Sequence, residues 1–311
     1  MSSLSSPSSQ PLRLMMAWRP QSPGSEAAQV VAWLGRTQAI TARTATVIPR
    51  AWTVQPEAKN LEKLKHWATK EAKACSKAAL GALDHAKLPH SMLDSEQASV
   101  VSVDHSETRA LIAAAEDFSA DAIVVGSHPA APQERFRIGS TADALLHCSP
   151  KPLLLSPRAP RLSKRGVTRV SCAYVDTDQS HEALRSAADL AARWQIPLRL
   201  VAFSPRGVTM YPTQTPFDDE SEQMVEWREQ ALALLDRGRD RALARHADLV
   251  VQTEAGSGYG WSGAMNALKW KKGDLLVLGS SQLGQFRRVF LGPSTNQILR
   301  HSPAPVLIVP V

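Results

Sequence analysis

The sequence predicts an α/β protein that consists of two tandem doubly wound domains, each built on a five-stranded parallel sheet. Short apolar segments of strand character alternate with segments of helical periodicity along the chain, and parallel strands need such helical crossovers. Residues 121–157 also recur, without a gap, as residues 274–310. The length of 311 residues suits two domains of about 150 residues each.

The repeat is the strongest single signal in the chain. Gly126 corresponds to Gly279 and Gly139 to Gly292, both at a spacing of 153 residues (279 − 126 and 292 − 139). Solenoid units are much shorter, at roughly 20–50 residues. The spacing therefore indicates a duplicated domain, so that any binding function was built on two related pockets.

The first domain is predicted over residues 12–157, after a Ser/Pro-rich tail at residues 1–11 that we expect to be disordered. Its strands are expected where short β-branched or continuous apolar runs are bounded by turn residues, at 12–18, 39–48, 98–103, 122–125 and 152–155. Its helices are expected where apolar residues recur every three or four positions, at 25–35, 61–86, 106–118 and 141–148. The continuous apolar run at 122–125 is typical of a parallel strand covered on both faces.

A Pro- and Arg-rich linker at 158–168 precedes the second domain, predicted over 169–311, in which the order of elements repeats. The expected strands are 170–175, 198–203, 249–254, 275–278 and 306–309, and the expected helices are 180–194, 220–247, 264–270 and 294–300. The Gly-rich stretch 256–263 contains a Gly-x-Gly-x-x-Gly spacing. No acidic residue ends a following strand about 20 residues on, as a dinucleotide site would require, so we interpret this stretch as a flexible loop.

Composition argues against several classes of protein. The net charge of +7 is spread over the chain without a Lys/Arg block, whereas a nucleic-acid-binding domain would concentrate it. The cysteines number three, with no Cys-x-x-Cys pair, so neither a disulfide framework nor a zinc site is indicated. No apolar run approaches the roughly 18 residues of a membrane span, and the N-terminal tail lacks the pattern of a signal peptide. We expect a cytoplasmic protein that binds neither nucleic acid nor membrane.

The residues best suited to binding an anion follow the fourth strand of each half. Gly126 and Gly279 end these strands, and each loop leads to a second glycine, Gly139 or Gly292, before a helix that begins with Ser or Thr. Glycine lets the backbone approach a ligand, and a helix N-terminus presents free N–H groups to a phosphate. One such loop, taken alone, is better explained as a tight turn and a helix cap. Two loops at the same spacing favour common ancestry at a phosphate site.

These segments resemble the signature of the universal stress protein family. The first copy reads ADAIVVGSH, RIGST and SPKPLLL, and the second reads GDLLVLGSS, FLGPST and SPAPVLIVP. The resemblance implies a five-stranded fold of the adenine nucleotide alpha hydrolase type in each half. It also implies pairing of the two halves as an internal pseudo-dimer through their last strands, with homodimerisation left open. Some family members bind ATP at a Gly-x-x-Gly-x9-Gly-Ser/Thr loop, and others lack the motif.

The chain departs from the family loop at three positions. The second glycine is Pro129 in the first half and Gln282 in the second, and Pro293 stands where Ser or Thr should follow the third glycine. Proline has no N–H to offer a phosphate. The family's nucleoside-contacting carboxylate, at the end of the first strand, is matched near Asp176, whereas the first half has Trp and Arg at residues 18–19. Each half thus keeps a part of a site.

The sequence predicts a tandem, non-enzymatic stress-response regulator that binds ATP or a related nucleotide, with Mg²⁺ entering only together with the nucleotide. Tryptophans in predicted helices, such as Trp67, are expected to pack in the core rather than stack on a base. Two alternatives stay open, a ligand-free scaffold for unknown protein partners and, with less support, a slow ATP-using enzyme. The predicted ligand contacts are Gly126, Gly139, Ser140, Thr141, Asp176, Gly279, Gly292, Ser294 and Thr295.

Overall fold

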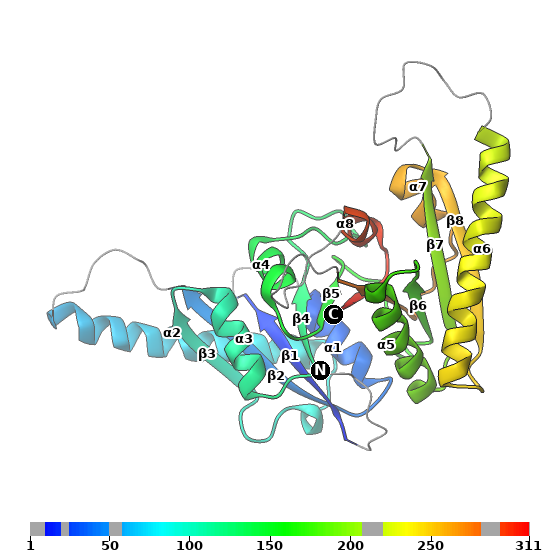
Figure 1. The fold of residues 1–311 in the computed structure, drawn as a ribbon. Helices are drawn as coiled ribbons and strands as arrows, with labels where there is room; N and C mark the ends of the chain where they lie inside the picture. The colour runs from blue at the N-terminus through cyan, green and yellow to red at the C-terminus, as the bar shows by residue number, and fades with distance from the viewer. Residues whose placement is uncertain (1–9, 20–24, 50–57, 207–219, 281–292, 311) are drawn as a thin grey trace, which may run out of the picture.

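The computed structural model describes residues 10–19, 25–49, 58–206, 220–280 and 293–310. The strands within these residues form one ten-stranded sheet (Figure 1). In the first half the elements are β1 (Leu12–Trp18), α1 (Glu26–Gly35), β2 (Ile40–Pro49), α2 (Ala58–His85), the 3₁₀ turn η1 (His90–Met92), β3 (Ser99–Asp104), α3 (Glu107–Asp117), β4 (Ala122–Gly126), α4 (Ser140–Cys148) and β5 (Leu153–Ser156).

The second half repeats this order of strands and helices. Its elements are β6 (Arg169–Ala173), α5 (Asp178–Trp194), β7 (Leu198–Arg206), α6 (Glu220–Arg245), β8 (Val251–Tyr259), α7 (Gly260–Asn266), β9 (Asp274–Gly279), α8 (Pro293–His301) and β10 (Val306–Val309). The predicted α/β class with five parallel strands in each half is confirmed.

The two halves meet edge to edge through their last strands. The sheet order is β3-β2-β1-β4-β5-β10-β9-β6-β7-β8. The order is symmetric, because each strand of the first half has its counterpart in the second half at the same distance from the opposite edge. β5 and β10 run antiparallel, with Leu154 opposite Leu307, whereas the neighbours within each half are parallel. The five-stranded sheets predicted for the halves are therefore one continuous sheet.

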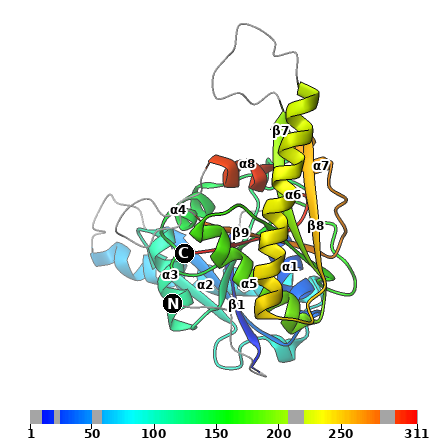
Figure 2. The same cartoon turned by 45° about the vertical axis from the view of Figure 1, so that its right-hand side comes forward.

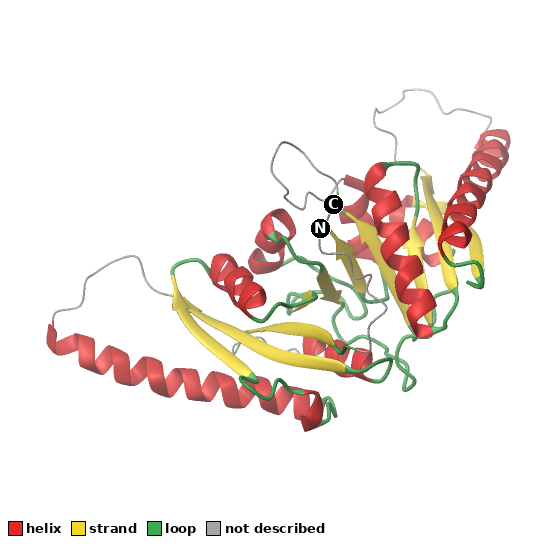
Figure 3. Cartoon of the chain, turned by 60° about the horizontal axis from the view of Figure 1, so that its bottom comes forward, coloured by secondary structure: helices red, strands yellow, loops and turns green. Residues whose placement is uncertain are grey.

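Helices cover both faces of this sheet (Figure 3). On one face the core includes buried side chains of α1, α2, α5 and α6, and on the other it includes those of α3, α4, α7 and α8. In Figure 2, α5 and α6 lie side by side over the second half. Successive residues of β1 serve opposite faces, since Leu14 and Met16 pack in one core and Met15 in the other. Strands covered in this way are apolar at every position, and the runs around Val124 and Val277 fit that rule.

The linker between the halves is packed against both of them. The backbone N–H of Val167 donates to Thr37 Oγ1 at 2.8 Å, and that of Ser163 donates to the carbonyl of Lys272 at 2.9 Å. Gly166 has a φ of +77° and sits against Thr37, where a Cβ would come within 2.4 Å of Oγ1. These bonds fix the linker to the first half on one side and to the second half on the other.

The interpretation of 256–263 as a flexible loop is wrong. β8 runs to Tyr259, and α7 begins at Gly260, earlier than the helix expected at 264–270. A Cβ on Gly258 would lie 2.4 Å from the backbone carbon of Gly263, so these glycines let α7 fold back directly onto β8. Close packing of helix on strand, rather than a ligand, accounts for the spacing.

Candidate functional site

A cavity of about 670 Å³ opens at the carboxyl edge of the sheet in the first half. The ends of β1, β2 and β4, one side of α2 and the first turns of α1, α3 and α4 form its walls. β1 lies between β2 and β4, so the strand order reverses at this point. Open α/β sheets bind ligands at such a reversal, and the volume lies in the range of small-molecule pockets.

Gly126 and Gly139 both line this cavity and leave open space in front of their backbones. A Cβ added to Gly126 would lie 3.8 Å from the nitrogen of Ala27, and one added to Gly139 would lie 3.7 Å from His128 Cδ2. These are ordinary van der Waals distances. Packing within the described residues therefore does not require glycine at either position.

Hydrogen bonds within the loop connect its beginning to its end, between the two glycines. Ser127 Oγ accepts from the backbone N–H of Arg137 at 2.9 Å, and the N–H of His128 donates to the Arg137 carbonyl at 3.0 Å. These bonds place Gly139 as the N-cap of α4, which begins at the exposed Ser140. Because Gly139 has no side chain to cap the helix, the first-turn N–H groups stay available to a ligand.

The hydroxyl of Thr141 is engaged by a carboxylate of α3. Thr141 Oγ1 donates to Glu107 Oε2 at 2.8 Å, and Arg19 donates to the two oxygens of Glu107 at 3.0 Å from Nε and 2.6 Å from Nη2. Burial alone would raise the pKa of Glu107, but the bonds from Arg19 and Thr141 outweigh it and hold the pKa below its usual value. Glu107 therefore carries its negative charge inside the cavity. No sequence pattern pointed to it.

The wall that α2 contributes is partly aromatic. Trp67 lines the cavity and is 50% exposed, so the prediction that it packs in the core is wrong. Trp18 lines the same cavity from the end of β1. Cys75 lies further along α2 and is buried, which raises the pKa of its thiol, and the nearby Glu71 adds to that rise. The two indoles give this pocket aromatic surface beside the glycine loop.

The equivalent strand end of the second half is closed. A Cβ on Gly279 would lie 2.3 Å from the carbonyl oxygen of Gln179 and 3.5 Å from Ala183 Cβ. The first turn of α5 therefore occupies the space that stays open in front of Gly126. The prediction that Gly279 makes room for a ligand is not supported, because the packing of α5 already requires a glycine there.

Asp176 is also paired with side chains of its own half. Its Oδ1 lies 2.8 Å from His181 Nε2 and 3.4 Å from Arg241 Nη1, and Arg241 also donates to the hydroxyl of Tyr174 at 3.1 Å. The hydrogen bond from His181, helped by the charge of Arg241, lowers the pKa of Asp176. The His181 ring stacks on that of Tyr174, with centroids 5.9 Å apart. The structure thus brings Asp176 to the expected edge but pairs it internally.

Strand register corrects the position assigned to the missing carboxylate. Leu14 pairs with Ala122 and Val170 with Leu275, so β1 and β6 superpose at an offset that matches Trp18 to Tyr174. The counterpart of Asp176 is then residue 20, one position beyond residues 18–19, and it lies outside the described residues.

Two of the remaining predicted contacts lie at the start of α8. Ser294 is exposed and Thr295 half-buried, just after Pro293. Gly292 lies outside the described residues, as do Gln282 and the loop around it. The described part of the second half therefore brings Ser294 and Thr295 to a helix start.

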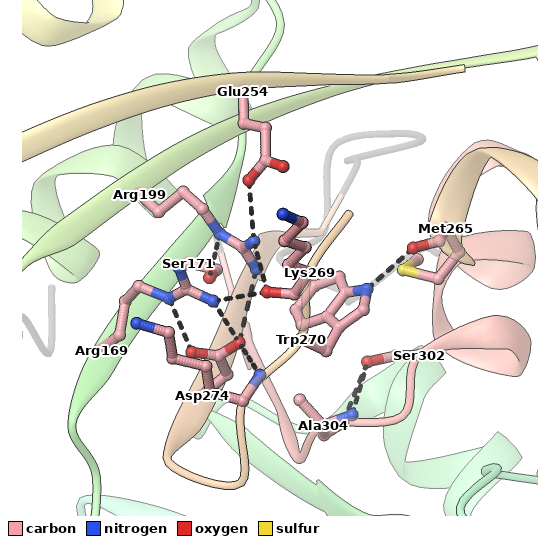
Figure 4. Close-up of polar contacts among 11 residues, drawn as sticks. Arg169, Ser171, Arg199, Glu254, Met265, Lys269, Trp270, Asp274, Ser302 and Ala304 are labelled. Carbon is pink, nitrogen blue, oxygen red and sulfur yellow. Dashed lines mark hydrogen bonds and ion pairs between the residues drawn. The ribbon is translucent and has the colours of Figure 1, made fainter. Parts of the chain in front are cut away.

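A charged cluster lies at the opposite, amino-terminal edge of the second half (Figure 4). The guanidinium of Arg169 donates to both oxygens of Asp274 at 2.7 Å, and Arg199 Nη1 donates to Glu254 at 3.0 Å. The side chain of Arg199 lies over the ring of Trp270 at 4.6 Å, and burial lowers its pKa although Asp274 opposes that change. The only sequence signal was the recurrence of Asp121 as Asp274. These side chains pair with one another across the strands, while Arg199 Nη2 has no hydrogen-bond partner among the described residues and lies 3.5 Å from Asp274.

Within the part of the chain that the structure describes, no helix combines the length and apolar character needed to cross a bilayer. A sequence model of the universal stress protein family matches residues 14–157 and again residues 166–310. The chain is 33% identical over 288 residues to the universal stress protein Rv2319c of Mycobacterium tuberculosis and, equally, to Mb2346c of Mycobacterium bovis. Each match covers 92% of this chain and 96% of the relative.

Solved structures resemble the fold over its full length. A universal stress protein from Archaeoglobus fulgidus superposes with a TM-score of 0.60 at 14% identity, covering 96% of this chain and 98% of that one. A putative universal stress protein from Pseudomonas aeruginosa gives a TM-score of 0.53 at 12% identity, with coverage of 97% and 94%. At these identities the likeness concerns the fold alone.

Proposed function

The chain belongs to the universal stress protein family, and we propose that it is a non-enzymatic, cytoplasmic stress-response regulator whose first half binds an adenine nucleotide or a related nucleoside ligand. The observation that carries the proposal is the contrast between Gly126 and Gly279. The first faces a cavity, and the second is closed by the carbonyl of Gln179. A single ligand per chain is therefore expected.

The roles of the cavity residues follow from their placement. Gly126 and Gly139 give the ligand access to the backbone, while the first-turn N–H groups of α4, with Ser140 and Thr141, suit a phosphate or a ribose hydroxyl. Trp18 and Trp67 line the same space, and aromatic rings of this kind stack on bases. Mg²⁺ would enter only as the counter-ion of a bound nucleotide.

We restrict the proposal to binding because two ionisable groups of the cavity, Glu107 and Cys75, are poorly suited to proton transfer or nucleophilic attack. Glu107 is held in its charged form by Arg19 and Thr141, and burial raises the pKa of the Cys75 thiol. A general acid or a nucleophile would need the opposite shifts. A ligand that stabilises one arrangement of the site is enough to regulate a partner.

Isothermal titration with ATP, AMP and adenosine tests the proposal. We expect binding of at least one of them near one molecule per chain. Gly126→Ala should weaken it about tenfold, which is a loss of about 1.4 kcal/mol, because the new methyl group enters the space of the ligand. The matched control is Gly81→Ala on α2, where a Cβ meets nothing within 4 Å, and its affinity should equal that of the wild type.

The second candidate is a scaffold that binds protein partners without a ligand. The close packing of Gly279 against Gln179 favours it, as does Pro129, which lines the cavity of the first half and has no N–H to donate. If none of the three compounds at millimolar concentration gives heat or a shift in melting temperature, the scaffold replaces the nucleotide-binding regulator.

A further inference from the structure

The cavity of the first half already holds an anion of the protein itself. Glu107 is the first residue of α3, and its carboxylate extends to the first turn of α4. There it accepts a hydrogen bond from the hydroxyl of Thr141 at 2.8 Å. Its side chain is 23% exposed, so most of it is screened from water. A negative charge beside a helix start is stabilised by the helix dipole, and this is the position that a phosphate would take.

Glu107 also engages an arginine of the cavity. Arg19 donates to both carboxylate oxygens, in the paired geometry that arginine uses equally well for carboxylates and phosphates. A ligand phosphate would therefore compete with Glu107 for two donors at once, the guanidinium of Arg19 and the hydroxyl of Thr141. It would also have to approach a charge of its own sign.

The rest of the described lining adds to this opposition. Glu26 and Glu71 also line the cavity, whereas Arg19 is the one Lys or Arg side chain among the described residues that do so. Like charges at short range in a partly dehydrated site repel strongly, because screening by water is reduced. The cost to a ligand rises with the number of negative charges that it carries.

We propose that Glu107 is a specificity-determining residue, an internal anion that makes the site select ligands of low negative charge, so that a nucleoside or nucleoside monophosphate binds better than a triphosphate. This inference rests on the proposed function, because it deepens the description of the same site. Glu107 acts here by competition and repulsion and carries out no chemical step.

The test compares adenosine, AMP and ATP, each titrated in EDTA, on the wild type and on Glu107→Gln. The amide has nearly the shape of the carboxylate and its oxygen still accepts from Thr141, but the charge is gone and Arg19 is released. We expect ATP to bind at least about tenfold more tightly to the variant and AMP to gain less, with adenosine within about twofold of the wild type. A gain that grows with ligand charge separates selection from a general change in folding.

Two control variants sharpen the outcome. Glu107→Asp keeps the charge and should keep the wild-type order of affinities. Glu116→Gln removes the same charge from an exposed position of α3 and should leave all three affinities unchanged. Circular dichroism and melting temperature confirm that each variant is folded before it is titrated.

The possible results are distinguishable. If adenosine binds the wild type and Glu107→Gln leaves the ratio of ATP to adenosine affinity unchanged, the role of Glu107 is refuted and the nucleotide site stands. The role of Glu107 is refuted in the same way if Glu116→Gln has an equal effect. If no compound binds the wild type or Glu107→Gln, the proposed function and this inference fail together.

Discussion

Arg43 of β2 and Arg199 of β7 occupy equivalent positions in the two halves, and each places its guanidinium over an aromatic ring. Arg43 pairs with Met15 of β1, and Arg199 pairs with Ser171 of β6 at the matching register. The rings are those of Phe118 at 4.4 Å and Trp270 at 4.6 Å. Both halves thus have a cation–π contact at the amino-terminal edge of the sheet, although the polar partners around it differ.

Asp274→Asn should destabilise the protein far more than Asp121→Asn. Asp274 is 1% exposed, accepts two bonds from Arg169 and lies 3.5 Å from Arg199. Its neutralisation leaves two buried arginines with a single carboxylate between them, which costs about 3–5 kcal/mol. Asp121 accepts a backbone N–H of Arg13, a contact of about 1 kcal/mol. Urea unfolding measures both, and equal losses would contradict this account of the cluster.

Gly279→Ala and Gly126→Ala should differ in stability as well as in ligand binding. A methyl group on Gly279 would press on the backbone carbonyl of Gln179, at a cost of about 1–3 kcal/mol. At Gly126 the methyl group meets atoms at normal contact distance, so a change within about 0.5 kcal/mol is expected. Thermal unfolding of both variants, without ligand, provides the comparison. Equal destabilisation would show that the first strand end is as closely packed as the second.

The ion pair in the cavity should make stability depend on pH. The folded-state pKa of Glu107 lies below the ordinary value of 4.5, so its contribution to stability is present above that value and is lost as pH falls through the folded pKa. Glu107→Gln should therefore be less stable than the wild type at pH 7, and the difference should shrink as the pH is lowered from 7 to below the ordinary pKa of 4.5. Denaturant unfolding across this range, with Glu116→Gln as the charge-matched control, measures it. A difference that is constant with pH would contradict the assignment.

One cysteine should react quickly with a thiol reagent in the native protein. Cys148 is exposed at the end of α4, whereas Cys75 and Cys172 are buried. Burial raises the pKa of Cys172 to about 12, so almost none of it is thiolate at neutral pH. We expect fast labelling of one equivalent per chain with an aromatic disulfide reagent, abolished by Cys148→Ser. Fast release of a second equivalent from folded protein would show that the reagent reaches Cys75, which lines the cavity, or the buried Cys172.

The local sequence pattern was sufficient to predict strands that are buried on both faces. The strands around Val124 and Val277 are covered on both faces and read as unbroken apolar runs, so their positions followed from the sequence. The stretch from Gly256 to Gly263 was misinterpreted because the same residues suit a flexible loop and a tight strand-to-helix packing. The contact with α7 that decides between these two structures is a property of the folded chain.

The candidate site was predictable in part. Gly126 and Gly139 were found from the repeat, whereas Glu107 was missed because it lies in another helix, 34 residues from Thr141. Asp176 was found from the family resemblance, but its pairing with Arg241 depends on the packing of α6. Such charge compensation arises only when distant elements meet, which is why the internal anion of the first half emerged from the fold.

The antiparallel contact of β5 with β10 has a consequence for how the molecule responds to its own abundance. Partners joined by one covalent chain meet at a high effective concentration whatever the total amount of protein, so dilution does not separate them. Each half also pairs with a half of different sequence instead of an identical subunit. A substitution in one half is therefore not repeated in the other, as it would be in a homodimer. The two halves are free to differ at the ends of their fourth strands, where Gly126 faces a cavity and Gly279 packs against the first turn of α5.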